Sequence, residues 1–259
     1  GAVFGLGVAF AGKLVLDRFE QPMSIGVLFL LSWFVCQFGY IFALFGRELP
    51  VPKEKVPIPW SRQMMAAAWR DREYLWFIII WDLYLAFYWP MLFTFLPIQG
   101  MRDLGMALSL SAVFMIIRHI VSIAGAPVFG YLTDRFSAKK MFFFWSFAAI
   151  LTFVPLLVTK NNLGVYAAMA AGAIVVTGIC TAGNTLMYGI PKAENRSGYY
   201  SLQLLVQSVS VTIGPMLLGR ILDIGFTHAI VGVTLLLAVL SLTSVTKLAG
   251  LSENPADYG

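Results

Sequence analysis

Residues 125–140 read GAPVFGYLTDRFSAKK and join two long apolar runs. The run before them covers residues 107–130, and the run after them, MFFFWSFAAILTFVPLLV, covers 141–158. A helix that crosses a bilayer needs about 20 predominantly apolar residues. The stretch therefore indicates a short charged connection between two membrane-crossing helices, and it fixes how the rest of the chain is interpreted.

The composition of the whole chain agrees with a membrane protein. Hydrophobic residues make up 59% of the chain and charged residues 12%, whereas soluble domains carry about 25% charged residues. The mean hydropathy is +0.80. We predict an all-α membrane protein with eight transmembrane helices, one in each apolar segment. The segments are 1–16, 24–45, 74–97, 107–130, 141–158, 164–190, 200–222 and 228–247.

Several classes of function are not indicated. The cations are scattered over short loops, so the net charge of +5 does not indicate nucleic-acid binding. Cys36 and Cys180 both lie in apolar runs, which argues against a disulfide framework. With two His and two Cys there is no metal-ligand cluster in the sequence, and there is no G-x-x-x-x-G-K-[ST] loop. We expect no enzyme activity, no cofactor and no metal.

The first residues and the longest polar segment suggest how the chain is divided. Gly1 already lies in an apolar run without a charged leader, so we expect a sequence that lacks its N-terminal part. Segment 46–73 contains four prolines, which favour an extended linker. The residues after Trp60 suit either an amphipathic helix on the membrane surface or a solvated linker. Two helices, in 1–45, would precede this segment, and six helices and a tail, in 74–259, would follow it.

The distribution of Lys and Arg predicts the orientation in the membrane. Twelve of the eighteen lie in 46–73, 131–140, 190–200 and the tail, and five lie on the opposite side. Positive residues concentrate in cytoplasmic loops. We therefore expect these four regions to be cytoplasmic.

A short motif occurs twice. Gly130-Tyr-Leu-Thr-Asp134 and Gly219-Arg-Ile-Leu-Asp223 both read G-x-[LI]-x-D, and each follows a proline. Three predicted helices separate the two copies, so they would face opposite sides of the membrane. This arrangement is typical of an inverted-topology repeat.

On these residues the chain resembles the major facilitator superfamily, whose fold has two six-helix halves built of inverted repeats. The family's cytoplasmic signature is G-x-L-x-D-R-x-G-[RK]-[RK]. Gly130, Leu132, Asp134 and Arg135 match it, whereas Ser137 stands where a glycine is usual and Ala138 where a cation is usual. The resemblance implies an MFS-type helical bundle, with the chain forming helices five to twelve of twelve. The N-terminal helices of the same protein would then be missing partners.

The resemblance also implies a role for the motif. Gly130, Asp134 and Arg135 would form a conformational latch between the two halves, since glycine permits close helix approach and a carboxylate interacts favourably with a helix N-terminus. The alternative is an ordinary positive-inside turn.

Polar residues inside apolar segments are candidates for a solute or ion pathway, because they should face protein or water. Asn184, Gln203 and Gln207 recur at helical spacing within two segments. Segments three, four, six and seven carry such faces, whereas five and eight would face lipid. The alternative for such residues is helix packing.

Segment three contains one carboxylate, Asp82, with Tyr84 and Tyr88 close to it. Aromatic residues with one polar handle suit an organic solute, although they also suit a lipid-facing belt. His119 is a candidate proton carrier or, alternatively, a packed and hydrogen-bonded histidine.

Arg118 and Asp82 are candidates for an ion pair inside the membrane, because each is costly there alone. Counting from Tyr74 and from Gly130 puts them about 12 and 18 Å from the same side, at about 1.5 Å per residue. The offset of about 6 Å lies within reach of an arginine side chain. Alternatively, each residue separately faces a wet cavity.

These features and the resemblance together predict a secondary active transporter that moves a small solute by alternating access, with protons as the candidate coupling ion. A non-transporting receptor or scaffold on the same fold is the alternative, and a channel is a third. The expected location is a bacterial-type inner membrane, with the lipid bilayer as a partner.

Overall fold

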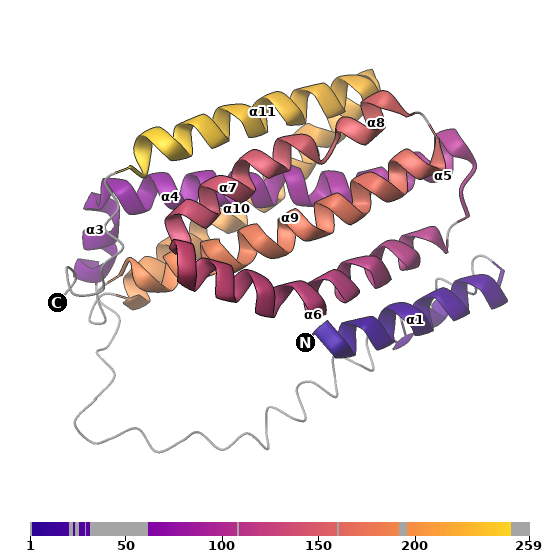
Figure 1. The fold of residues 1–259 in the computed structure, drawn as a ribbon, viewed down its shortest axis with the longest axis horizontal. Helices are drawn as coiled ribbons and strands as arrows, with labels where there is room; N and C mark the ends of the chain where they lie inside the picture. Colours follow the sequence, from indigo (N-terminus) through magenta and orange to yellow (C-terminus); the bar gives the residue numbers. More distant parts are fainter. Residues whose placement is uncertain are drawn as a thin grey trace, which may run out of the picture.

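The computed structural model describes the chain except for residues 1, 21–22, 24–25, 29, 32–61, 108, 160, 192–195 and 250–259. Nearly all the described residues are helical, and the long helices lie side by side in one bundle (Figure 1). The helices are α1 (Ala2–Arg18), α3 (Arg62–Arg70), α4 (Arg72–Leu83), η1 (Tyr84–Tyr88), η2 (Met91–Phe95), α5 (Leu96–Leu104), α6 (Leu110–Phe136), α7 (Ala138–Leu151), α8 (Val154–Val158), α9 (Asn162–Gly189), α10 (Arg196–Ile224) and α11 (Phe226–Lys247).

Six helices in the described part of the chain are long and apolar enough to cross a membrane: Arg72–Leu104, Ala112–Phe136, Ala138–Val158, Asn162–Gly189, Arg196–Ile224 and Phe226–Lys247. The all-α membrane bundle is thus confirmed, but the predicted count of eight is too high for the described residues. Segment 1–16 forms α1, whose 17 residues give about 26 Å of helix. Most of segment 24–45 lies outside the described residues.

The ends of these helices follow ordinary capping chemistry. Asp71 caps α4 by accepting a hydrogen bond from the Tyr74 backbone N–H at 3.0 Å, and Asn161 caps α9 in the same way through Gly164. Gly105 ends α5 at φ +63°, a left-handed conformation that glycine adopts without steric cost. Local sequence therefore determines where the spans begin and end.

The span Arg72–Leu104 is not a uniform α-helix. Two π-helical stretches, η1 and η2, interrupt it on either side of Pro90. Proline has no backbone N–H and cannot make the usual bond to the carbonyl four residues earlier. A π-helical pattern, with bonds between residues i and i+5, is frequent at functional sites.

The core lies around this span and α9. More than half of the span Arg72–Leu104 and more than half of α9 are buried. By contrast, only 22% of the Ala112–Phe136 span and 22% of the Arg196–Ile224 span are buried. Glycines in α9 accept large side chains: a Cβ at Gly178 would overlap the Trp145 indole, and one at Gly183 would overlap Trp81. α9 therefore packs closely against α7 and contacts the Trp81 side chain of α4.

A short helix, α3, follows Trp60, and residues 46–61 lie outside the described residues. It stands across the end of the bundle where α4 begins and packs against α10 (Figure 1). Ala68 is buried in this contact, and Trp69 is exposed. The two faces of this short helix thus differ as the amphipathic interpretation expects.

The connection between α6 and α7 differs from the prediction. Residues 131–140 do not form a loop, because α6 continues to Phe136 and α7 begins at Ala138. The whole turn is Ser137, with φ 80° and ψ 145°. This region of the backbone map is populated almost only by glycine, which accounts for the glycine at the corresponding place in the family signature.

Ser137 therefore stores backbone strain that a substitution can release. We expect Ser137→Gly to raise the stability of the protein by about 1 kcal/mol, at the low end of the cost of such a conformation, and Ser137→Val to lower it. The control is Ser109→Gly at the start of α6, where φ is −58° and no gain is expected. Thermal unfolding of the purified full-length protein measures all three. Equal midpoints for wild type and Ser137→Gly would contradict the strain.

Candidate functional site

Asp82 is the candidate site residue with the most unusual surroundings. Its side chain is completely buried in α4. Gln203 of α10 donates from Nε2 to Asp82 Oδ1 at 3.5 Å, at the long limit for a hydrogen bond. The second oxygen, Oδ2, has no hydrogen-bond partner among the described residues. The structure thus brings together two predicted pathway residues and leaves one acceptor unsatisfied.

The neighbours of Asp82 hold it in this position. Trp81 packs against Gly183 of α9, and its ring lies nearly parallel to Phe77, with centroids 6.4 Å apart. Gln203 is itself buried. The carboxyl group therefore lies in the contact between α4, the start of the most buried span, and α10.

Arg118 lies elsewhere, and the predicted ion pair with Asp82 is wrong. Its guanidinium carbon is 4.3 Å from the centroid of the Trp89 ring and 5.0 Å from that of Phe93. The prediction took Gly130 as the end of the helix, but α6 ends at Phe136. Arg118 is therefore about 27 Å from that end and Asp82 about 15 Å from the start of α4, at about 1.5 Å per residue. The offset is about twice the expected one.

His119 follows Arg118 but points to a different neighbour. Its ring fills the space beside Gly5 of α1, where a Cβ would overlap the imidazole. Helix α1 lies along α6 (Figure 1). This environment fits the packed histidine that the sequence left as the alternative.

Tyr84 and Tyr88 are buried, and their hydroxyl groups are engaged. The Tyr84 hydroxyl lies 2.9 Å from Ser241 Oγ of α11, and the Tyr88 hydroxyl lies 2.7 Å from Oγ1 of Thr152. Ser241 in turn donates to the Ser146 carbonyl of α7 at 2.9 Å. These bonds direct both tyrosines toward the α7 and α11 side of the bundle.

The remaining pathway candidates are more accessible. Gln207 is half-buried and lies one helical turn beyond Gln203 on α10, while Asn184 is exposed on α9. Their exposure leaves their amide groups available to a solute or to water.

The latch candidates lie on the last two turns of α6. Asp134 and Arg135 are exposed, and Arg135 donates to the Tyr131 hydroxyl at 3.2 Å. A Cβ at Gly130 would meet nothing within 4 Å among the described residues. The close helix approach expected at Gly130 is therefore absent from the part of the chain that the structure describes.

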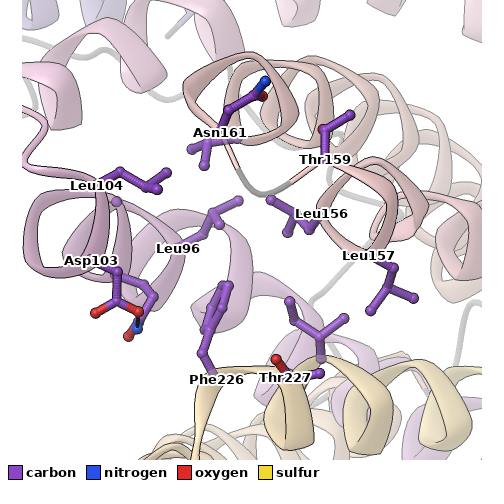
Figure 2. Close-up of a pocket in the computed structure, with 13 residues that line it drawn as sticks. Leu96, Asp103, Leu104, Leu156, Leu157, Thr159, Asn161, Phe226 and Thr227 are labelled. Carbon is purple, nitrogen blue, oxygen red and sulfur yellow. Dashed lines mark hydrogen bonds between the residues drawn. The ribbon is translucent and has the colours of Figure 1, made fainter.

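A cavity of about 400 Å³ lies at the other end of the span, between α5, α8 and the first turns of α9 and α11. Figure 2 shows Leu96, Leu156 and Phe226 around it, with Asp103 at its edge. No pattern in the sequence indicated this cavity, and none of the predicted pathway residues lines it. Its carboxylate, Asp103, is exposed, so the cavity lacks the buried charge that marks an intramembrane ion pathway.

Comparison with known proteins assigns the family. No curated protein matches the chain. A family model described as Major Facilitator Superfamily matches residues 111–256, which is more than half of the chain and runs from α6 into the tail. Six membrane-spanning helices and an all-α bundle agree with this match. The chain therefore belongs to the major facilitator superfamily, a family of multi-pass membrane proteins that transport small solutes.

Proposed function

We propose that the protein is a secondary active transporter that moves a small solute by alternating access and couples this movement to protons at Asp82. The observation that carries the proposal is the buried carboxyl group between α4 and α10, one oxygen of which has no hydrogen-bond partner in the described part of the chain. An ionisable residue inside a membrane bundle is a functional candidate by default. A buried charge with too few hydrogen-bond donors is also costly to maintain.

Proton binding at Asp82 changes the contact with Gln203. The ionised carboxylate accepts a charge-assisted hydrogen bond from the Gln203 amide, which is stronger than a neutral one. The protonated group relieves the unpaired oxygen and weakens this bond. The α4–α10 contact therefore has two states that differ by one proton, as coupling requires.

Asn184, Gln207 and Arg118 complete the proposed pathway, because none of the three side chains is fully buried. Tyr84 and Tyr88 are left out, since their hydroxyls bond toward α7 and α11. His119 is left out because it packs against α1. A receptor or scaffold remains the alternative function, and absence of gradient-driven flux would favour it.

The proposed orientation puts the α6–α7 turn on the cytoplasmic side of a bacterial-type inner membrane, supported by the Lys and Arg distribution. There, Asp134 and Arg135 would act as the latch, since both are exposed and Asp134 forms no ion pair within the described residues. In this scheme, residues 1–45 belong to the N-terminal half and 46–73 is the cytoplasmic linker. Uptake by Asp134→Asn, compared with uptake by Asp223→Asn in proteoliposomes, tests the latch.

The test of proton coupling is Asp82→Asn in the full-length protein. A stability screen of the purified protein first identifies a solute that binds. In proteoliposomes, we expect Asp82→Asn to lower pH-gradient-driven uptake of this solute about tenfold or more, the equivalent of about 1.4 kcal/mol. Solute exchange without a gradient should persist, because it needs no proton movement.

The matched control is Asp103→Asn, an exposed carboxyl near the end of the same span, which should behave as wild type. Undiminished accumulation by Asp82→Asn would remove Asp82 from the coupling mechanism. If the wild-type protein accumulates no solute under any gradient, the receptor or scaffold alternative replaces transport.

A further inference from the structure

Arg118 carries a charge that nothing in the described part of the chain neutralises. The two ion pairs found there are Lys13–Asp17 and Arg102–Asp103. Arg118 lies within α6, about 12 Å from its start at Leu110 and about 27 Å from its end at Phe136, at about 1.5 Å per residue. Its side chain is half-buried. A charge at such a position faces protein or water and marks a solute or ion pathway.

Two aromatic rings hold the guanidinium group without using its hydrogen-bond donors. The contacts to Trp89 and Phe93 join the guanidinium carbon to the ring faces. A guanidinium carries five N–H donors that point outward in its own plane. The structure shows no hydrogen bond from Arg118 to any described residue. The rings therefore orient the group and leave its donor edge unoccupied.

A third helix borders the same place. Helix α9, which carries Cys180, packs along α6. Cys180 is half-buried. The guanidinium group of Arg118 thus lies among three elements: the π-helical part of the first span, α6 and α9. Within the described residues, these elements surround it with aromatic and apolar side chains, and no carboxylate pairs with it.

The chemistry of this arrangement selects one class of ligand. A guanidinium pairs with a carboxylate through two parallel hydrogen bonds, a geometry that an ammonium group does not match. Aromatic walls favour an apolar body attached to the charged group. On the basis of the proposed function, we infer that the transported solute is an organic monocarboxylate with an apolar body, whose carboxylate pairs with Arg118.

This assignment fits proton coupling at Asp82. One monoanion moving together with one proton carries no net charge across the membrane. Uptake of the monocarboxylate should therefore be driven by a pH gradient and be insensitive to the membrane potential.

The experiment compares anions with their neutral counterparts on the purified full-length protein. The probes are benzoate with benzamide, hexanoate with hexanamide, and indole-3-acetate with its amide. At least one carboxylate should raise the thermal unfolding midpoint, and its amide should not. Arg118→Gln should abolish this shift, and Arg118→Lys, which keeps the charge but not the paired donors, should weaken it. Arg220→Gln, at an exposed arginine on α10, should keep it.

Uptake of the radiolabelled probe in proteoliposomes then separates the two proposals. Arg118→Lys provides a folded comparison if Arg118→Gln is unstable, and we expect it to lower carboxylate uptake about tenfold, the factor of a lost interaction of about 1.4 kcal/mol. The inference is overturned if the amides shift the midpoint as strongly as the carboxylates, if no probe shifts it, or if Arg118→Gln keeps the shift. Gradient-driven uptake of a neutral solute by Arg118→Gln would overturn the inference that the solute is a carboxylate. It would leave the transport proposal standing. Carboxylate binding that needs Arg118, without any driven uptake, would support the Arg118 site and overturn transport.

Discussion

Replacing Gly214 with alanine should destabilise the protein strongly, although the substitution adds only one methyl group. An added Cβ at Gly214 would lie 2.6 Å from the Ala86 Cβ and 2.6 Å from the Ala86 carbonyl oxygen. The second of these atoms belongs to the backbone of η1, so no side-chain rotation relieves the overlap. Helix α10 must move away from the first span. Overpacking of this kind costs about 1–3 kcal/mol, or more when backbone must move.

Gly219 supplies the matched control on the same helix. A Cβ there would meet nothing within 4 Å among the described residues, and alanine favours a helix over glycine by about 1 kcal/mol. Gly219→Ala should therefore be neutral or stabilising. Thermal unfolding of both purified variants at equal expression measures the difference. Midpoints for Gly214→Ala at or above those for Gly219→Ala would show that α10 and η1 are not in close contact at Ala86.

Truncating Tyr84 should produce the other large effect. The side chain is 2% exposed and its hydroxyl contacts Ser241 Oγ and the Ser146 carbonyl. Removing a buried aromatic ring costs about 3–5 kcal/mol in soluble proteins. Lipid is as apolar as the protein core, so a membrane protein loses mainly the packing part. We expect Tyr84→Ala to cost about 2–4 kcal/mol and Tyr84→Phe, which removes only the hydroxyl, to cost about 1 kcal/mol.

This pair of variants also decides between packing and a role in the pathway. If Tyr84 only packs, Tyr84→Phe should transport at the wild-type rate per folded molecule, with an unchanged KM for the solute. Tyr188→Phe, at an exposed tyrosine on α9, serves as the control for loss of a hydroxyl group. An increased KM without loss of stability in Tyr84→Phe would return Tyr84 to the solute pathway.

The spans themselves could be predicted from the sequence, because a long apolar run is a property of composition. Segment 200–222, for example, appears as α10 (Arg196–Ile224). The turn at Ser137 could not be predicted. Asp134 and Arg135 mark where the chain reaches water, but the backbone there continues the helix to Phe136. The end of an apolar run is therefore not the end of a helix.

The same error affected the site. Polarity within apolar runs identified both Asp82 and Gln203, which the structure brings together. The predicted pairing of Asp82 with Arg118 was nevertheless wrong, because the depth of Arg118 was counted from Gly130 and not from Phe136. The cavity near Asp103 gave no signal, since helix ends from three separate parts of the sequence form it: the end of α5, the α8–α9 connection and the start of α11. Contacts of this kind depend on how helices are placed and not on the pattern within any one of them.

The π-helical stretches around Pro90 have a consequence for how this chain is aligned with its relatives. A single π turn usually accommodates one extra residue locally, so the side chains on either side keep the faces they would have in a shorter, uniform α-helix. A relative that lacks one residue opposite Tyr84–Tyr88 or Met91–Phe95 would then still form the same membrane-spanning helix. Positions matched without such gaps would compare residues about 100° apart around the helix axis. Equivalents of Asp82 and of Trp89 therefore need to be located separately, each within its own stretch of regular helix.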